Sequence, residues 1–143
     1  MTSMIETFAR LHIPGNPLVL FNIWDAGSAK AVAEAGAQAI ATGSYGVAEA
    51  QGFKDGEAFT LDLALTNLER IVGVTDLPVT LDMESGYGAT AEEVGRSVAT
   101  ARAAGAVGIN LEDRMPGKAE LTPLAEQARR IAAAAASGIF VNA

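Results

Sequence analysis

The chain has 143 residues, half of them hydrophobic, with no cysteine and a net charge of −7. This length and apolar content suit one globular domain, and the lack of thiols excludes a disulfide framework, a thiolate metal site and a cysteine nucleophile. The acidic balance, with lysines and arginines scattered singly, argues against a nucleic-acid-binding protein. No charged-then-apolar leader opens the chain and no apolar run approaches the roughly 18 residues of a membrane span, so we expect a soluble, cytoplasmic protein without a membrane partner.

In chain order, the pattern predicts an opening helix and then alternating strands and helices. Met4, Ile5, Phe8 and Leu11 share one face of a helix over 3–11. Continuous apolar runs predict buried strands, and segments with helical periodicity lie between them. The expected strands are 18–25, 39–44, 77–84, 107–112 and 139–143, and the helices between them are 28–36, 60–74, 90–105 and 122–136.

Local signals support these helix boundaries. Ser28 is a plausible N-cap, Thr90 and Glu93 form a T-x-x-E capping box, and Pro123 suits a first helical turn. Residues 45–59 show little periodicity and several glycines, which is typical of a functional loop.

Alternating βα units leave two architectures, an open doubly wound sheet or the first part of an eight-stranded barrel. The last residues form a strand without a covering helix, and such a strand exposes an unpaired edge. We therefore expect an α/β fold in which 1–143 is a single domain, the N-terminal part of a (β/α)8 TIM barrel truncated after the fifth strand or completed by another chain.

Acidic residues follow the third and fourth predicted strands. In a strand, Asp82 and Glu84 project to the same side, and Glu112 ends the next strand beside Asp113. Oxygen ligands without histidine or cysteine suit Mg²⁺, with Mn²⁺ as the alternative, and such an ion could polarise the carbonyl of a small carboxylate substrate. The structural alternative is that these acids cap helices or pair with arginine.

Four other features are open to two interpretations. The turn at Gly43, Ser44 and Tyr45 could offer backbone N–H groups to an anion, or its glycine could serve only to let the chain turn. Trp24 suits the core more often than a substrate platform, and Asp25 is equally well explained as a helix cap or a pocket wall. His12 is expected to be a packing or surface residue.

Four segments in order, NIWDAGSAKAVAEAG, AIATGSYGVAEAQGFKD, LDMESGYG and INLED, resemble the isocitrate lyase/phosphoenolpyruvate mutase family of Mg²⁺-dependent enzymes acting on 2-oxo acids. The resemblance implies a metal site at Asp82, Glu84 and Glu112, although the family usually has aspartate where Glu84 stands. It also implies a dimer or tetramer.

The same resemblance assigns further roles. The substrate-binding residues that it implies are Trp24, Asp25, Gly43, Ser44 and Tyr45. Asp55 falls on the aspartate of a mobile gating loop and Lys118 on a lysine of a second loop, and both are expected to be catalytic.

One departure leaves the reaction open. Isocitrate and methylisocitrate lyases of the family carry a K-[KR]-C-G-H loop, and this chain has DRMPGKAELTP there, without cysteine or histidine. Phosphonopyruvate mutases also lack that cysteine but favour asparagine near the position of Glu120. We expect a lyase-type enzyme that cleaves a C–C or P–C bond through an enolpyruvate-like intermediate. The alternatives are a mutase or hydrolase of phosphonopyruvate, a fragment that only binds or assembles, and a phosphate-binding sugar-isomerase barrel.

Overall fold

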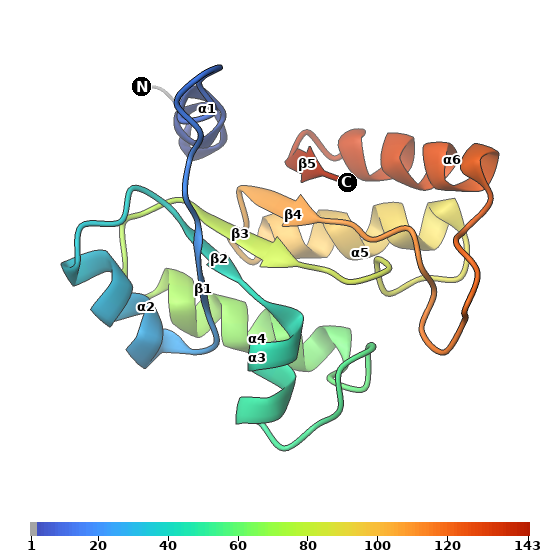
Figure 1. Ribbon diagram of the computed structural model, residues 1–143, viewed down its shortest axis with the longest axis horizontal. Helices are drawn as coiled ribbons and strands as arrows, with labels where there is room; N and C mark the ends of the chain where they lie inside the picture. The colour runs from blue at the N-terminus through green and yellow to red at the C-terminus, as the bar shows by residue number, and fades with distance from the viewer. Residues whose placement is uncertain (1–2) are drawn as a thin grey trace.

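The computed structural model of the protein describes residues 3–143 and contains one five-stranded parallel sheet (Figure 1). The strands lie in the order β1-β2-β3-β4-β5, the same as their order in the chain. They are β1 (Phe21–Ile23), β2 (Ile40–Thr42), β3 (Val79–Asp82), β4 (Gly108–Asn110) and β5 (Phe140–Asn142). A doubly wound sheet would reverse its strand order, so the sequential order confirms the barrel-type prediction.

One helix precedes the first strand and the others connect the strands, and the helices over 26–34, 61–72, 91–103 and 124–135 cover one face of the sheet. The helices are α1 (Met4–Arg10), α2 (Ala26–Glu34), α3 (Ser44–Ala50), α4 (Leu61–Val72), α5 (Ala91–Ala103) and α6 (Leu124–Ala135). Along this face α2 contacts α4, α4 contacts α5, and α5 packs closely on α6. Figure 1 shows α2 and α4 under the first strands and α5 and α6 side by side near β4 and β5.

The main core lies between the sheet and these helices. It contains Ile23, Ile40, Leu81 and Ile109 from the strands, with Leu68, Ile71, Val94 and Val98 from the helices. Because strand residues alternate between faces, the residues beside them point to the opposite face, which in a barrel is the interior. Asp82 pairs in register with Asn110, and Asn110 pairs with Asn142, so three polar residues form one row at the carboxyl end of the sheet.

A smaller apolar cluster closes the amino end of the sheet. Phe8 from α1 is buried with Ala39 and Val107, which precede β2 and β4. The His12 ring stacks on Phe140 with centroids 4.4 Å apart. His12 is thus a packing residue, as the sequence predicted.

The strands are shorter than the sequence predicted, which changes the surroundings of two acids. β3 ends at Asp82 and β4 at Asn110, so Glu84 and Glu112 lie in the loops that follow. Glu84 has a φ of 49°, which no strand residue adopts. The prediction that Asp82 and Glu84 share one side of a strand is therefore wrong.

Two predictions of helix position were also wrong. Ser28 was expected to cap the helix after β1, but the N-cap is Asp25, three residues earlier, and α2 begins at Ala26. The expected loop over 45–59 begins instead with the helix α3, which starts at Ser44. The Thr90–Glu93 capping box is confirmed, with the Glu93 N–H donating to Thr90 Oγ1 at 3.2 Å.

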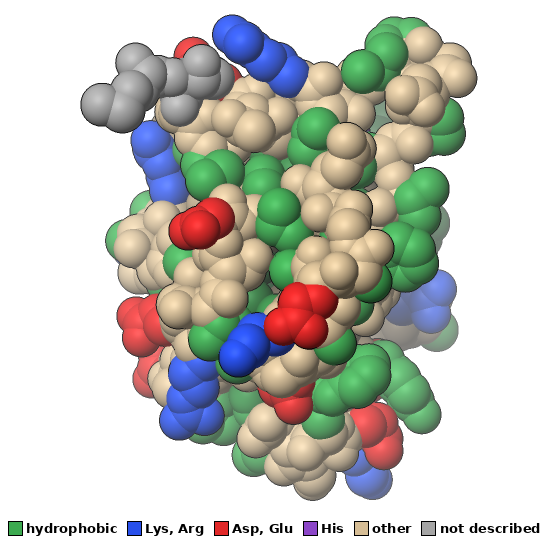
Figure 2. Space-filling model, turned by 90° about the vertical axis from the view of Figure 1, so that its left-hand side faces the viewer, with side chains coloured by type: hydrophobic (Ala, Val, Ile, Leu, Met, Phe, Trp, Pro, Cys, Tyr) green, Lys and Arg blue, Asp and Glu red, His purple; other side chains and the backbone are tan. Residues whose placement is uncertain are grey.

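The surface mixes charged and apolar side chains. On the face seen in Figure 2, acidic and basic side chains are interspersed among apolar ones. Among the helices of residues 3–143, none combines the length and hydropathy that crossing a lipid bilayer requires.

Candidate active site

Asp82 links β3 to the start of α3. Its Oδ2 accepts a hydrogen bond from the Ser44 N–H at 2.9 Å, and its Oδ1 accepts one from the Glu84 N–H at 3.1 Å. The N-cap of α3 is Gly43, which has no side chain to cap the helix, so Asp82 supplies the missing acceptor from another strand. Each carboxylate oxygen keeps a further lone pair for another partner.

Gly43, the N-cap of α3, packs closely against β1. A Cβ on Gly43 would lie 2.8 Å from the Asn22 side-chain amide on β1, closer than real Cβ contacts allow. The small residue therefore lets α3 begin directly against the first strand, and this brings Ser44 within reach of Asp82.

Glu84 is a buried carboxyl group, only 6% exposed. Its Oε2 accepts a hydrogen bond from the Glu57 N–H at 2.7 Å, and Oε1 lies 3.4 Å from the Tyr87 hydroxyl. The pKa of Glu84 is raised to about 7, chiefly by burial and also by the nearby charges of Asp55, Glu57 and Asp82, while the hydrogen bond from the Glu57 N–H lowers it. Burial also raises the pKa of Tyr87.

Glu57 fastens the loop after α3 to the loop after β3. Its Oε1 accepts hydrogen bonds from the Ser85 hydroxyl at 2.5 Å and from the Tyr87 N–H at 3.1 Å. Glu57, Glu84 and Tyr87 all have φ near +50° to +60°, a conformation that costs of order 1–3 kcal/mol per residue. These long-range hydrogen bonds hold the strained segment in place and bring Asp55 over the sheet edge.

A cavity of about 890 Å³ opens beside this segment, at the carboxyl ends of β3, β4 and β5. Asp55, Glu84, Glu112 and Lys118 all line it. Desolvation raises the pKa of Glu112, and the charges of Asp82 and Asp55 raise it further. The structure thus brings two of the three predicted metal ligands, Glu84 and Glu112, to one cavity with both predicted catalytic residues.

A second cavity, of about 250 Å³, lies at the carboxyl ends of β1 and β2. It is lined by Trp24, Gly43, Ser44, Tyr45 and Asp82, among others. Trp24 is 46% exposed, so it is a wall of this cavity and not a core residue. Asp82 thus borders the second cavity and also hydrogen-bonds to Glu84 of the first.

Asp25 lines neither of these two cavities. Its Oδ1 accepts hydrogen bonds from the Ser28 N–H at 2.7 Å and the Ser28 hydroxyl at 2.8 Å. The backbone and side-chain hydrogen bonds from Ser28 hold the pKa of Asp25 below its usual value. Of the two roles that the sequence left open for Asp25, the structure shows the helix cap.

The donor set fits a hard divalent cation held partly through water. Within residues 3–143, no three acidic or histidine side chains lie close enough to share one ion directly. In the same residues the one ion pair joins Arg129 to Glu126, so no basic side chain lies at ion-pair distance from the carboxylates of the candidate site. Mg²⁺ commonly takes only one or two direct carboxylates and keeps several waters, which suits this arrangement.

Two contributors to this candidate site, Asn110 and Glu57, were missed in the sequence. Asn110 stands in register with Asp82, and its Oδ1 accepts a hydrogen bond from Asn142 at 2.9 Å. Its place at a strand end, two residues before Glu112, was a usable signal. Glu57 lies in a segment without periodicity, so it gave no local signal.

The chain matches the phosphoenolpyruvate phosphomutase family over residues 8–143. It is 36% identical over 119 residues to the 2-methylisocitrate lyase of Escherichia coli (strain K12), a match covering 76% of this chain and 40% of that protein. The chain thus spans about 40% of the length of the first curated relatives that it matches.

Solved structures share the fold. A "putative phosphonomutase" from Burkholderia cenocepacia J2315 has a TM-score of 0.95 and 50% sequence identity, covering 99% of this chain and 60% of that one. Phosphonopyruvate hydrolase, solved as a complex with oxalate and Mg²⁺, has a TM-score of 0.88, covering 95% of this chain and 48% of that one. Its identity of 23% shows the shared fold alone. By its match over residues 8–143, the chain belongs to the phosphoenolpyruvate phosphomutase family, whose members similar to it include lyases and mutases.

Proposed function

We propose that this chain carries the metal- and carboxylate-binding part of a Mg²⁺-dependent lyase-type enzyme that cleaves a C–C or P–C bond in a small 2-oxo acid. The observation that carries the proposal is the set of carboxylates at one sheet edge, Asp55, Asp82, Glu84 and Glu112. Within residues 3–143 these acids have no basic partner at ion-pair distance, and the pKa values of Glu84 and Glu112 are raised. A divalent cation would offset this repulsion.

In this proposal Asp82, Glu84 and Glu112 hold the ion, partly through water. When bound, Mg²⁺ would supply Lewis-acid stabilisation of an enolate-like oxygen. The first-turn N–H groups of Tyr45 and Gly46 have no acceptor within α3, and with the Ser44 hydroxyl they suit a substrate carboxylate.

The loops complete the proposed site. Lys118 lines the large cavity and can pair with a second anionic group of the substrate. Asp55 lines the same cavity, two residues from Glu57, which is hydrogen-bonded to the loop after β3, and in this proposal it shields the cavity from water. The proposed substrate is therefore small and carries at least one carboxylate.

Isothermal titration with Mg²⁺ in the presence of oxalate, an enolate mimic, tests the proposal. We expect Asp82→Asn to weaken binding roughly 100-fold, since ligand and supporting groups of metal sites cost factors of this order. Asparagine keeps one oxygen for the hydrogen bond to α3, so the fold should persist. Asp76→Asn makes the same charge change at an exposed residue before β3 and should bind as wild type does. Absence of binding by wild type, or equal affinity for Asp82→Asn, would refute the proposal.

A phosphonate reaction is the second candidate. Two observations favour it: the 50% identity to the protein described as a phosphonomutase, and a 113–123 loop without cysteine or histidine. Phosphonopyruvate and a 2-methyl-substituted malate offered to the same preparation would separate C–C from P–C chemistry, because only P–C chemistry yields a product from the phosphonate.

A further inference from the structure

Two polar residues of α6 are buried against the loops that carry the acids. Gln127 and Arg130 are 7% and 1% exposed, and their spacing of three places them on the same face of the helix. Neither belongs to the proposed metal or substrate contacts. A buried charged group is costly to desolvate, so its contacts need an explanation.

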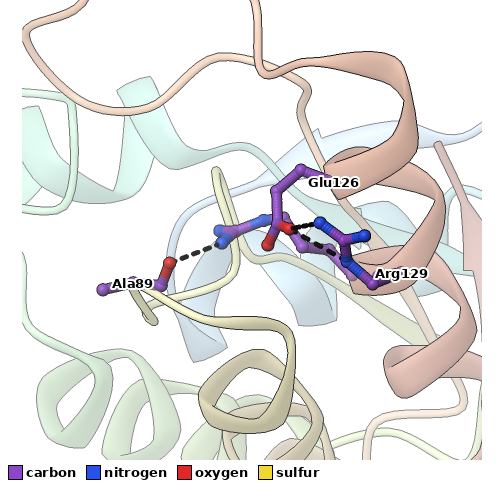
Figure 3. Close-up of polar contacts among 4 residues, drawn as sticks. Ala89, Glu126 and Arg129 are labelled. Atoms are coloured by element: carbon purple, nitrogen blue, oxygen red, sulfur yellow. Dashed lines mark hydrogen bonds and ion pairs between the residues drawn. The ribbon is translucent and has the colours of Figure 1, made fainter.

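The side chain of Arg130 binds the backbone of the turn that follows β3. Its guanidinium donates to the carbonyl oxygens of Ser85 at 2.6 Å, Gly88 at 2.9 Å and Ala89 at 3.3 Å. The bond to Ala89 can be followed in Figure 3, where the neighbouring Arg129 turns instead to Glu126. No carboxylate within residues 3–143 forms an ion pair with Arg130, so its partners are peptide dipoles of one segment.

Gln127 binds the loop after β4, which carries Glu112. Its Nε2 donates to the Glu112 carbonyl at 3.1 Å. The Glu112 N–H in turn donates to the Glu84 carbonyl at 2.7 Å, so the two acidic residues are joined directly through their backbones. One helix therefore fixes both ends of this connection, Glu112 through Gln127 and the residue after Glu84 through Arg130.

The strained backbone shows why such support matters. Glu84 and Tyr87 adopt positive φ angles, and the Cβ of any residue at Gly86 would lie 2.9 Å from Leu111 and Val94. From the other side the segment is held by Glu57. Arg130 occupies the helix side, where it satisfies three carbonyl groups that the tight turn leaves without partners in the sheet.

We propose that Arg130 and Gln127 are positioning residues, which set the separation and orientation of Glu84 and Glu112 by tying the two loops to α6. The proposal rests on the metal-binding function proposed above. It assigns to α6 a role in the site although the helix contributes no side chain to the acid cluster itself.

Backbone amide exchange, followed by NMR in the metal-free protein, tests directly whether the hydrogen bonds from Arg130 and Gln127 hold the two loops. Arg130→Met keeps the apolar stem and removes the donors, and we expect exchange of the Tyr87 and Glu112 N–H groups to accelerate by at least about tenfold. Gln127→Met should accelerate Glu112 and leave Tyr87 unchanged. Arg130→Lys, which retains a cationic donor, should recover part of the protection lost in Arg130→Met.

Two controls separate positioning from general stability. Arg129→Met removes the same charge from the adjacent, exposed arginine and should leave both amides as in wild type. Val98→Ala opens a cavity in the core where α5 packs, and its melting temperature provides a reference for destabilisation without loss of a side-chain hydrogen bond. Each variant is measured at the same number of degrees below its own melting temperature. If exchange of the two amides is accelerated no more in Arg130→Met than in Val98→Ala, Arg130 is a packing residue and the proposal is overturned.

Mn²⁺ binding, measured by paramagnetic resonance, then connects the ties to the site. We expect Arg130→Met to bind Mn²⁺ about 10- to 100-fold more weakly than wild type, and Val98→Ala to bind as wild type does. Equal Mn²⁺ affinities of wild type and Arg130→Met would overturn the proposal. If wild type itself bound no Mn²⁺, the proposed function would fail, and the exchange measurements would still decide whether the ties exist. If Arg130→Met does not fold, Arg130→Lys and Gln127→Met decide by the same criteria.

Discussion

At the amino ends of the strands, Phe8, His12 and Phe140 pack ring against ring, whereas at the carboxyl ends the groups that meet are carboxylates, amides and backbone N–H groups. The same five strands supply both ends. The difference therefore comes from the segments attached to them: α1 closes the amino end with apolar side chains, and the loops over 51–60, 84–89 and 111–123 surround the other with polar ones.

The two ends also differ in how they affect stability. Burying aromatic rings stabilises the fold, while burying Glu84 among other acids opposes it. The carboxyl end retains strained and repelling groups that the amino end does not have. Such groups are typical of binding and catalytic sites, where stability is given up for function. If the comparison is right, substitutions at the two ends should change different measurable properties.

The largest expected effect on stability is at the amino end. Phe8→Ala removes a ring that is 1% exposed and makes edge contacts with His12 and Phe140. We expect the free energy of unfolding, measured by urea titration, to fall by about 3–5 kcal/mol. Among the molecules that remain folded, affinity for Mg²⁺ with oxalate should not change. A matching loss of affinity would show that the two ends are not independent.

The next effect concerns pH and the buried carboxyl group. The pKa of Glu84 is raised from 4.5 to about 7, so between these values the folded protein binds a proton that the unfolded chain has released. The free energy of unfolding should therefore decrease as the pH rises from 4.5 to 7, by on the order of 2 kcal/mol. Glu112, whose pKa is also raised, adds to the decrease.

Glu84→Gln should remove most of this decrease, since the amide stays neutral and its oxygen can still accept the hydrogen bond from the Glu57 N–H. Urea titrations at several pH values provide the measurement. Glu49→Gln, at an exposed residue of α3, should keep the wild-type profile. Parallel profiles for wild type and Glu84→Gln would contradict the assignment of the pH dependence to this group.

Local patterns in the sequence predicted what local interactions determine. The capping box of α5 depends on residues three apart and was found, and of the predicted face of α1 Ile5, Phe8 and Leu11 pack together while Met4 is exposed. The parallel order of the strands followed from their alternation with helices. The start of α3 was missed because its glycines weaken the helical pattern, and the group that completes its first turn is Asp82, 38 residues away.

The acids of the candidate site could be named from the sequence, but their arrangement could not. Asp82, Glu84 and Glu112 stand out as polar residues after apolar runs, yet nothing local indicates that Glu57 reaches Ser85 across 28 residues or that Arg130 reaches it across 45. These contacts decide where the strands end and where the side chains point. Tertiary hydrogen bonds, which leave no periodicity in the chain, are thus the part that the sequence did not disclose.

The smallest expected effect separates structure from substrate binding at Asp25. The resemblance implies a substrate contact, whereas the structure uses the carboxylate to cap α2. Asp25→Ala should lower the free energy of unfolding by about 1 kcal/mol, and Asp25→Asn should restore most of it, because asparagine is an equally good N-cap. Titration of Asp25→Asn with Mg²⁺ and oxalate then measures the role of the charge alone. If its affinity equals that of wild type, Asp25 is a capping residue that stands near the site. If affinity falls while stability is kept, the carboxylate also acts on the ligand, and the helix cap and the substrate site share one side chain.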